Sequence, residues 1–157
     1  MRTDNGSVKN TIISVYFILI VLAVVMATVF SAFKDITNNA GLTFIIILAV
    51  FAALFLAVYL IAKYFEYDSD GDKVIVTNKG LLLSERFNYR SHNVEFAKEE
   101  LVGFKIVNYI VYRELVLYIK KEGRKSVKKR FNISLVTRRK RKYVRQSLSK
   151  IIKNNIK

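Results

Sequence analysis

The sequence predicts an α+β membrane protein in which an N-terminal transmembrane helical hairpin is followed by a small antiparallel β-barrel that a C-terminal helix closes. Three observations lead to this prediction: two long uncharged runs lie before residue 63, apolar and polar residues alternate after it, and a helical periodicity appears near the C-terminus. The chain has 157 residues and is 52% hydrophobic, yet its formal net charge is +15. These values are compatible because the apolar and the basic residues occupy different parts of the chain.

The two uncharged runs cover residues 11–33 and 41–62. At 1.5 Å per residue, a helix over the first run is about 34 Å long, which is enough to cross a hydrocarbon core of about 30 Å. Only seven residues, 34–40, separate the runs, so we expect the two helices to be antiparallel and adjacent. A cleaved signal peptide is the alternative for the first run, but its apolar stretch would usually have about 7–15 residues. We therefore interpret the run as a retained helix.

Alanines spaced four residues apart mark one face of each expected helix, with Ala23 and Ala27 in the first run and Ala49 and Ala53 in the second. Small residues at this spacing let helix backbones approach closely in lipid. We expect these alanines to pack the hairpin or to face a partner protein. Neither run contains an ionisable residue, and transport usually requires such groups near the bilayer midplane. The hairpin is therefore interpreted as an anchor.

The charges that flank the runs predict the orientation. Arg2 and Lys9 precede the first run and Lys63 follows the second, whereas the connecting loop contributes Lys34. Because positive residues are enriched in cytoplasmic segments, both termini are expected in the cytoplasm. The predicted organisation is a cytoplasmic N-terminal tail over residues 1–10, a transmembrane hairpin over 11–62 and a basic soluble domain over 63–157.

After residue 63 the pattern predicts about seven strands and one helix. Asp-Gly at 70–71 and Asn-Lys-Gly at 78–80 indicate turns that divide residues 65–84 into three short strands. Two further strands are expected over 94–100 and 101–110, and a hairpin over 113–133 that turns at Glu122-Gly123. A helix from Ser134 or Thr137 to about Lys153 follows, because either residue can serve as the N-cap of a segment with helical periodicity. Its apolar stripe comprises Val144, Leu148, Ile151 and Ile152.

This order of elements resembles bacterial membrane proteins that carry a pleckstrin-homology-like domain. The likeness is carried by the segment VIVTNKGLLLS, with Thr77, Gly80 and the leucines 81–83, and by the later apolar strand LVGFKIVNYI. The resemblance implies a pleckstrin-homology-like barrel in the soluble domain and a multi-pass location in the bacterial inner (cytoplasmic) membrane. That fold hosts lipid-binding, peptide-binding and scaffold roles alike. The chain is also similar to other small bacterial membrane proteins, from which no activity carries over.

Almost all of the net charge belongs to the last 38 residues. Residues 63–119 contain eight basic and nine acidic residues, whereas residues 120–157 contain sixteen basic residues and one acidic residue. Basic residues in the first turn of a helix oppose its dipole by about 0.3–1 kcal/mol each and also repel one another. An external anion is therefore expected to offset this cost. The candidate anion-binding residues are Lys128, Lys129, Arg130, Arg138, Arg139, Lys140, Arg141, Lys142 and Arg145.

Three anionic partners fit this cluster, beside the simpler interpretation of a solvated surface. Anionic membrane lipid attracts nearby basic residues by about 1 kcal/mol each. RNA, including a ribosome beside the membrane, offers phosphates, and a partner in a membrane-protein complex could offer an acidic surface. The predicted function is a non-catalytic membrane-anchored adaptor or accessory subunit of a larger inner-membrane assembly. The alternative is a ribosome- or RNA-associated factor, for example beside a protein-translocation complex.

The sequence offers little for catalysis or metal binding. It contains no Cys, and His92 is its single His, so the usual zinc-ligand sets are not available. The acidic segment 68–72 lacks the EF-hand spacing and is interpreted as a hairpin turn, and no nucleotide-binding or nucleophile motif is present. Glu99 and Glu100 are strand neighbours that are expected to point to opposite faces. We therefore predict no enzyme activity, no cofactor, no metal and no small-molecule substrate.

Overall fold

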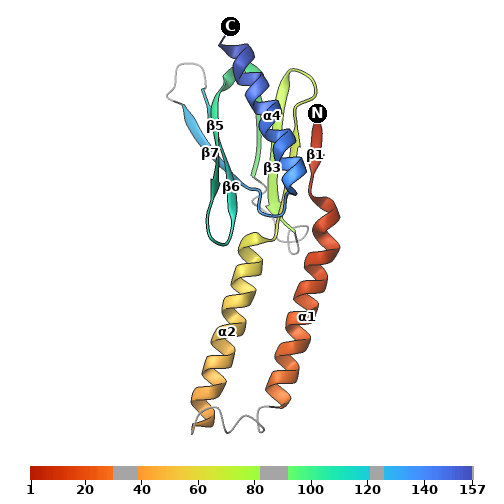
Figure 1. Cartoon of the computed structure of the whole chain (residues 1–157), viewed down its shortest axis with the longest axis vertical. Coiled ribbons are helices and arrows are strands. Elements are labelled where there is room, and N and C mark those ends of the chain that lie inside the picture. Colours follow the sequence, from red (N-terminus) through yellow and green to blue (C-terminus); the bar gives the residue numbers. More distant parts are fainter. Residues whose placement is uncertain (30–38, 82–91, 121–125, 157) are drawn as a thin grey trace. The chain divides into compact units, whose positions relative to one another are not determined.

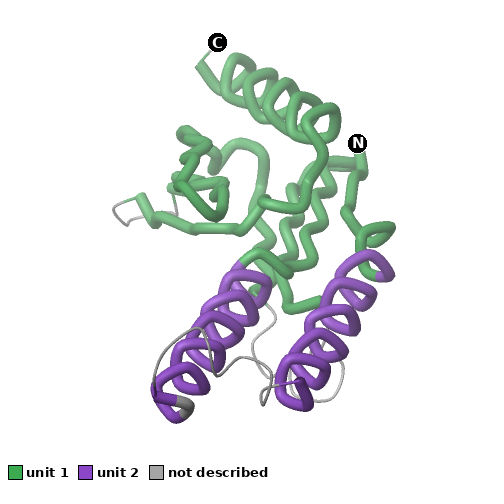
Figure 2. Tube along the Cα trace, turned by 60° about the horizontal axis from the view of Figure 1, so that its bottom comes forward, with its two compact units in different colours: residues 1–9, 61–157 green, residues 10–60 purple. Residues whose placement is uncertain are grey.

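A computed structural model of the protein describes residues 1–29, 39–81, 92–120 and 126–156. The chain forms two compact units, one made of residues 1–9 and 61–157 and the other of residues 10–60 (Figure 2). The first unit contains all of the described strands and the C-terminal helix, and we call it the sheet unit. The second contains nearly all of two long helices, and we call it the helical unit.

The two long helices are α1 (Lys9–Thr28) and α2 (Ala40–Ile61) (Figure 1). They correspond to the runs predicted at 11–33 and 41–62, although residues 30–38, with most of the predicted loop, lie outside the described part. By length and composition, both helices could cross a membrane.

One pair of aromatic rings marks the facing sides of α1 and α2. Tyr16 and Phe55 stack with their ring centroids 5.9 Å apart. In both helices most of the half-buried residues lie on the face that carries these rings, and Ala23 is one of these half-buried residues. The other predicted packing residues are exposed: Ala27, Ala49 and Ala53. Large side chains therefore line the facing side of α2, and docking of a further helix against its alanines stays a prediction.

The sheet unit contains two antiparallel sheets and one covering helix (Figure 1). The first sheet has the strand order β1-β2-β3-β4, with bounds Arg2–Asp4, Lys63–Asp68, Lys73–Gly80 and His92–Ala97. The second has the order β5-β6-β7, with bounds Leu101–Asn108, Arg113–Ile119 and Val127–Asn132. The C-terminal helix α4 covers Arg138–Asn155, and two short 3-10 helices, η1 and η3, cover Gly6–Val8 and Lys98–Glu100.

The predicted closed barrel is wrong, because the two sheets remain separate. One edge of β2 pairs with β3 and its other edge pairs with β1, so β2 has no free edge for a strand that would close a barrel. At the other side, η3 interrupts the extended backbone between β4 and β5. The α+β class with a C-terminal helix is as predicted, but the strands form an open pair of sheets.

Strand β1 differs from the tail predicted over residues 1–10. Arg2, Thr3 and Asp4 pair in antiparallel register with Asp68, Tyr67 and Glu66 of β2. The segment before α1 is thereby bonded to the segment after α2, although the whole helical unit separates the two segments in sequence. Arg2 also donates to the Glu66 carboxylate at 2.9 Å, which adds a charged hydrogen bond to this pairing.

The hydrophobic core lies between the two sheets and α4. Alternate residues of the strands point into it, and the largest fully buried side chains are Tyr67, Phe65 and Phe131. Val144, Leu148 and Ile151 of α4 are buried against them, which confirms three residues of the predicted stripe, while Ile152 is partly buried. Thr137 is the N-cap of α4, as one of the two predicted alternatives, and its hydroxyl accepts from the Lys140 N–H at 3.4 Å.

Several predicted local features differ in detail. The turn at 70–71 is present, and Gly71 adopts a φ of 70°, which favours glycine. The second turn is wrong, because β3 continues through residues 78–80, and most of the third predicted strand lies outside the described residues. Glu99 and Glu100 belong to η3 instead of a strand. His92 begins β4, and the turn at Glu122-Gly123 lies outside the described residues.

Candidate anion-binding groove

A groove of about 500 Å³ lies between the first two turns of α4 and the end of the β5–β6 hairpin. Seven residues line it: Ile106, Asn108, Arg113, Arg138, Arg141, Lys142 and Arg145. Five of them are cationic, and the described lining includes no carboxylate. Within the described ranges, none of the five has an ion-pair partner. The groove is therefore a concentration of positive charge that the described residues leave without ion pairs.

The α4 wall follows from helical spacing. Arg138, Arg141, Lys142 and Arg145 occupy positions i, i+3, i+4 and i+7, which lie on one face of an α-helix. Within the same stretch, Val144 is buried in the core. The four cations therefore form a row at the edge of the face that packs on the sheets.

The opposite wall follows from strand register. Asn108 pairs with Arg113, and Ile106 pairs with Leu115, so these residues share one face of the β5–β6 hairpin. Leu115 is fully buried, which identifies this face as the one that points to the core. Asn108 and Arg113 extend that face to the end of the hairpin. Arg113 of β6 therefore lies across the groove from the row of cations on α4.

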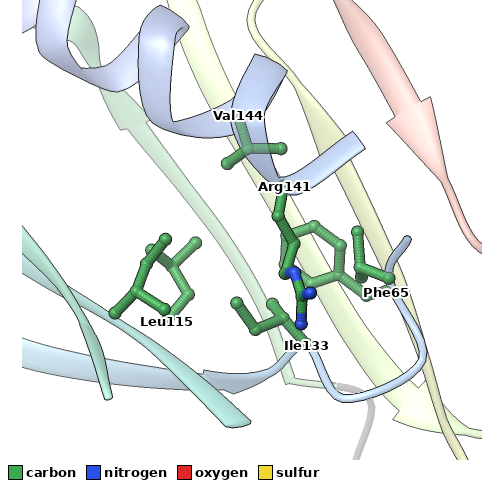
Figure 3. A pocket seen from close by; sticks show the side chains of 7 residues that line it. Phe65, Leu115, Ile133, Arg141 and Val144 are labelled. Carbon is green, nitrogen blue, oxygen red and sulfur yellow. The ribbon is translucent and has the colours of Figure 1, made fainter. Parts of the chain in front are cut away.

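Arg141 is half-buried, whereas the other four cations are exposed. Figure 3 shows its side chain beside the apolar residues that surround it. Its guanidinium points from α4 toward Phe65 and Ile133, and it also borders a small apolar hollow of about 10 Å³ beneath the groove. The residue as a whole is half-buried, but its Nη1 atom is enclosed and has no hydrogen-bond partner among the described residues. Burial lowers the pKa of Arg141, and the nearby charges of Arg113 and Arg138 lower it further. An arginine remains protonated at neutral pH all the same.

The α4 wall is bonded to the end of the sheet unit where the chain joins the helical unit. This junction end comprises residues 4–9 and 61–65, which lead into α1 and out of α2. Lys140 Nζ donates to the Asp4 carbonyl at 2.5 Å. Asn5 is fully buried; its side chain donates to the Lys63 carbonyl at 3.0 Å and accepts from the Phe65 N–H at 2.8 Å. The first turn of α4 therefore lies at the junction end.

The hairpin wall reaches the same end through a second set of bonds. Asn78 donates to the carbonyls of Tyr64 and Asn132, at 2.9 and 3.0 Å. The next residue, Ile133, donates its N–H to the Arg113 carbonyl at 2.9 Å. Burial, together with the hydrogen bond to Glu66, raises the pKa of Tyr64 to about 12, so its hydroxyl stays a donor at neutral pH. Both walls of the groove are thus attached to the junction end.

The predicted anion-binding residues divide into two groups. Arg138, Arg141, Lys142 and Arg145 meet in the groove. The others do not line it: Lys128, Lys129 and Arg130 lie on β7, and Arg139 and Lys140 belong to other faces of α4. Arg139 donates to the Tyr143 hydroxyl at 2.9 Å. A run of five adjacent cations must divide in this way, because neighbouring helical residues point in different directions.

Sequence reasoning missed Arg113, Asn108 and Ile106. Arg113 is an isolated cation in a strand, and no charge run marks it. Its position beside α4 depends on the β5–β6 register and on how α4 packs. The alternation of β6 does indicate that Arg113 shares a face with Leu115, but not which element covers that face.

Arginine-rich grooves of this kind recognise phosphate. The planar guanidinium presents paired N–H donors that match two oxygens of a phosphate or carboxylate. Four arginines and one lysine around a single space favour an anion with several oxygens, and Ile106 leaves part of the lining apolar. Within the described residues, no group of three or more His, Asp or Glu side chains could hold a metal ion. The chemistry available in the groove is therefore binding of an anion.

Comparison of the chain with protein-family models, with curated proteins and with solved structures finds no match.

Proposed function

We propose that this protein is a non-catalytic, membrane-anchored adaptor or accessory subunit of an inner-membrane assembly, and that its groove binds the phosphate headgroup of an anionic lipid. The observation that carries the proposal is the position of five cations at the junction end of the sheet unit, none of them ion-paired to a described residue. A phosphate at this end would offset both the charge repulsion and the unfavourable helix dipole.

The bonding between β1 and β2 supports the membrane part of the proposal. If α1 and α2 cross a bilayer, the segments before and after them must lie on the same side, because those segments pair with each other. Two crossings satisfy this requirement. The basic residues near the junction favour the cytoplasmic side for both termini, in the inner membrane of a bacterium.

Lipid is favoured over RNA by the same geometry. The groove belongs to the end of the unit from which the chain passes directly into both apolar helices, so a lipid headgroup would be close by if those helices cross a bilayer. RNA binding by contrast usually uses a broad basic surface with exposed aromatic or backbone-tracking elements. The predicted anion-binding residues of this chain are instead divided among a compact groove, other faces of α4 and the separate strand β7.

Hydrogen exchange on the full chain in nanodiscs tests the proposal. Anionic lipid should slow amide exchange over residues 106–113 and 138–145 relative to zwitterionic lipid, because a bound ligand stabilises the state that it binds. The variant R113Q/R138Q/R145Q should lose this protection. Equal exchange in both lipids would overturn the lipid assignment. Protection that appears only when ribosomes or RNA are added would overturn it in favour of the RNA-associated alternative.

A further inference from the structure

The tip of the β5–β6 hairpin consists of Tyr109, Ile110, Val111 and Tyr112. Ile110 is 105% exposed, and Val111 and Tyr109 are 49% and 44% exposed. Hairpin turns are normally built from Gly, Asn, Asp, Pro or Ser, because these residues adopt the turn conformations or bond to the turn backbone. Two β-branched aliphatic residues at this tip do not serve the turn. Local departures of this kind are expected where a segment has a function.

The tip is an ordered structure. The Tyr109 N–H donates to the Tyr112 carbonyl at 2.9 Å, and the two tyrosine rings stack with centroids 4.6 Å apart. The Tyr109 hydroxyl also lies 3.5 Å from the Glu114 carboxylate. The aliphatic pair is thus held between two aromatic residues that each have a polar hydroxyl end.

The tip adjoins the groove and shares its location. Asn108 and Arg113, which line the groove, are the residues on either side of the tip. The Arg113 carbonyl accepts from the Ile133 N–H, and the neighbouring Asn132 is bonded through Asn78 to Tyr64 at the junction end. The exposed apolar residues and the unneutralised cations therefore lie side by side at the end that leads into α1 and α2.

We infer that this tip inserts into the interface of the membrane that α1 and α2 span. Ile110 and Val111 enter the outer part of the acyl chains, and the tyrosines lie at headgroup level, where aromatic residues with a polar end are enriched. The neighbouring groove binds the phosphate of the lipids that the tip contacts, so apolar insertion and electrostatic attraction act together. The inference rests on the proposed function in requiring that the two helices lie in a bilayer.

The size of the patch favours a lipid surface over a protein. A stable protein interface buries about 800 Å² on each partner, which far exceeds two aliphatic side chains. A tethered domain needs much less area to stay on a bilayer, because its helices already hold it there. The patch is also bordered by cations, which complement anionic headgroups.

A single fluorescent label tests the inference in the full chain. The sequence contains no cysteine, so an I110C variant takes one environment-sensitive probe, and the full exposure of Ile110 means that the label replaces no packing. In nanodiscs with anionic lipid, the probe emission should shift to the blue and should be quenched by lipids that carry a nitroxide on the acyl chain. An N154C variant is the matched control, because Asn154 is exposed at the far end of α4, and its probe should emit as in water.

The outcomes separate this inference from the proposed function. Emission from the I110C probe that matches the N154C probe in every lipid would overturn the inference, and a blue shift without nitroxide quenching would overturn it in favour of a protein contact. If hydrogen exchange shows protection of the groove but the I110C probe is exposed to water, the inference is overturned and the proposed function is supported. A quenched probe without groove protection would leave insertion standing and overturn headgroup binding.

Discussion

At Arg141 we expect stability and the proposed phosphate binding to favour different side chains. Its enclosed Nη1 atom has no partner among the described residues, and an unsatisfied buried donor costs about 1–3 kcal/mol. Replacement of the group that carries such a donor by an apolar side chain of similar length removes this cost. We therefore expect the proposed phosphate ligand, and not the fold, to account for a guanidinium at this position.

We expect R141M to stabilise the sheet unit by about 1 kcal/mol in zwitterionic nanodiscs, which corresponds to a rise of about 4 °C in its melting temperature. In anionic nanodiscs the gain should shrink or reverse, because the variant loses a phosphate contact. Thermal denaturation followed by circular dichroism measures both. R145M is the control, since Arg145 is an exposed groove residue and its removal relieves no burial. A lower melting temperature for R141M in zwitterionic lipid would show that Arg141 is structural.

At the scale of elements, the first turn of α4 places four cations against the positive end of its own dipole. Arg138 faces the groove, and Arg139 bonds to Tyr143 on another face. Both residues oppose the dipole, but only Arg138 lines the groove. The effect of charge at the helix N-terminus can therefore be separated from the effect of the groove by two substitutions that make the same change in charge.

R138E should stabilise α4 in zwitterionic lipid, because it replaces an unfavourable charge at the helix N-terminus with a favourable one. R139E makes the same change of charge but loses the bond to Tyr143, so it should stabilise α4 less. Only R138E should abolish the hydrogen-exchange protection of the groove in anionic lipid. Thermal denaturation and hydrogen exchange on the two variants check this. Equal loss of protection in both would mean that net charge, and not the groove, determines binding.

The elements differ in how far local sequence predicts them. Helix α4, its Thr137 cap and its buried stripe are predictable because their signals recur every three or four residues. The separation of Arg139 from Arg138 also follows from helical spacing. The open sheets do not follow in this way, because the edge of β2 opposite β3 pairs with the three-residue strand β1, which precedes the helical unit in sequence. The contribution of Arg113 to the groove is likewise not predictable from local sequence, since it depends on tertiary packing.

At the scale of the whole molecule, β1 and Asn5 bond the segment that precedes the two long helices to the segment that follows them. The sheet unit depends on residues 1–5 for its edge strand and for the buried Asn5 side chain. A fragment that starts at residue 63 lacks both. Tests of the groove accordingly require the full chain.

The variant N5A should destabilise this end of the sheet unit by about 2 kcal/mol, because the buried Phe65 N–H loses its acceptor and the Lys63 carbonyl loses a donor. Hydrogen exchange over residues 63–69 should accelerate accordingly. N10A serves as the control, since Asn10 lies five residues after Asn5 in the chain and its side chain is exposed. Unchanged exchange in N5A would contradict the view that Asn5 holds the two chain segments together.

We expect the groove, and not basic charge in general, to bind anionic lipid. Native mass spectrometry of the full chain, extracted in a neutral detergent, counts the lipids that remain bound to it. We compare R113Q/R138Q/R145Q with K128Q/K129Q/R130Q, which removes the same charge from β7 outside the groove. We predict that the wild type and the β7 variant retain anionic phospholipid and that the groove variant does not. Equal retention by both variants, or equal loss from both, would contradict the claim.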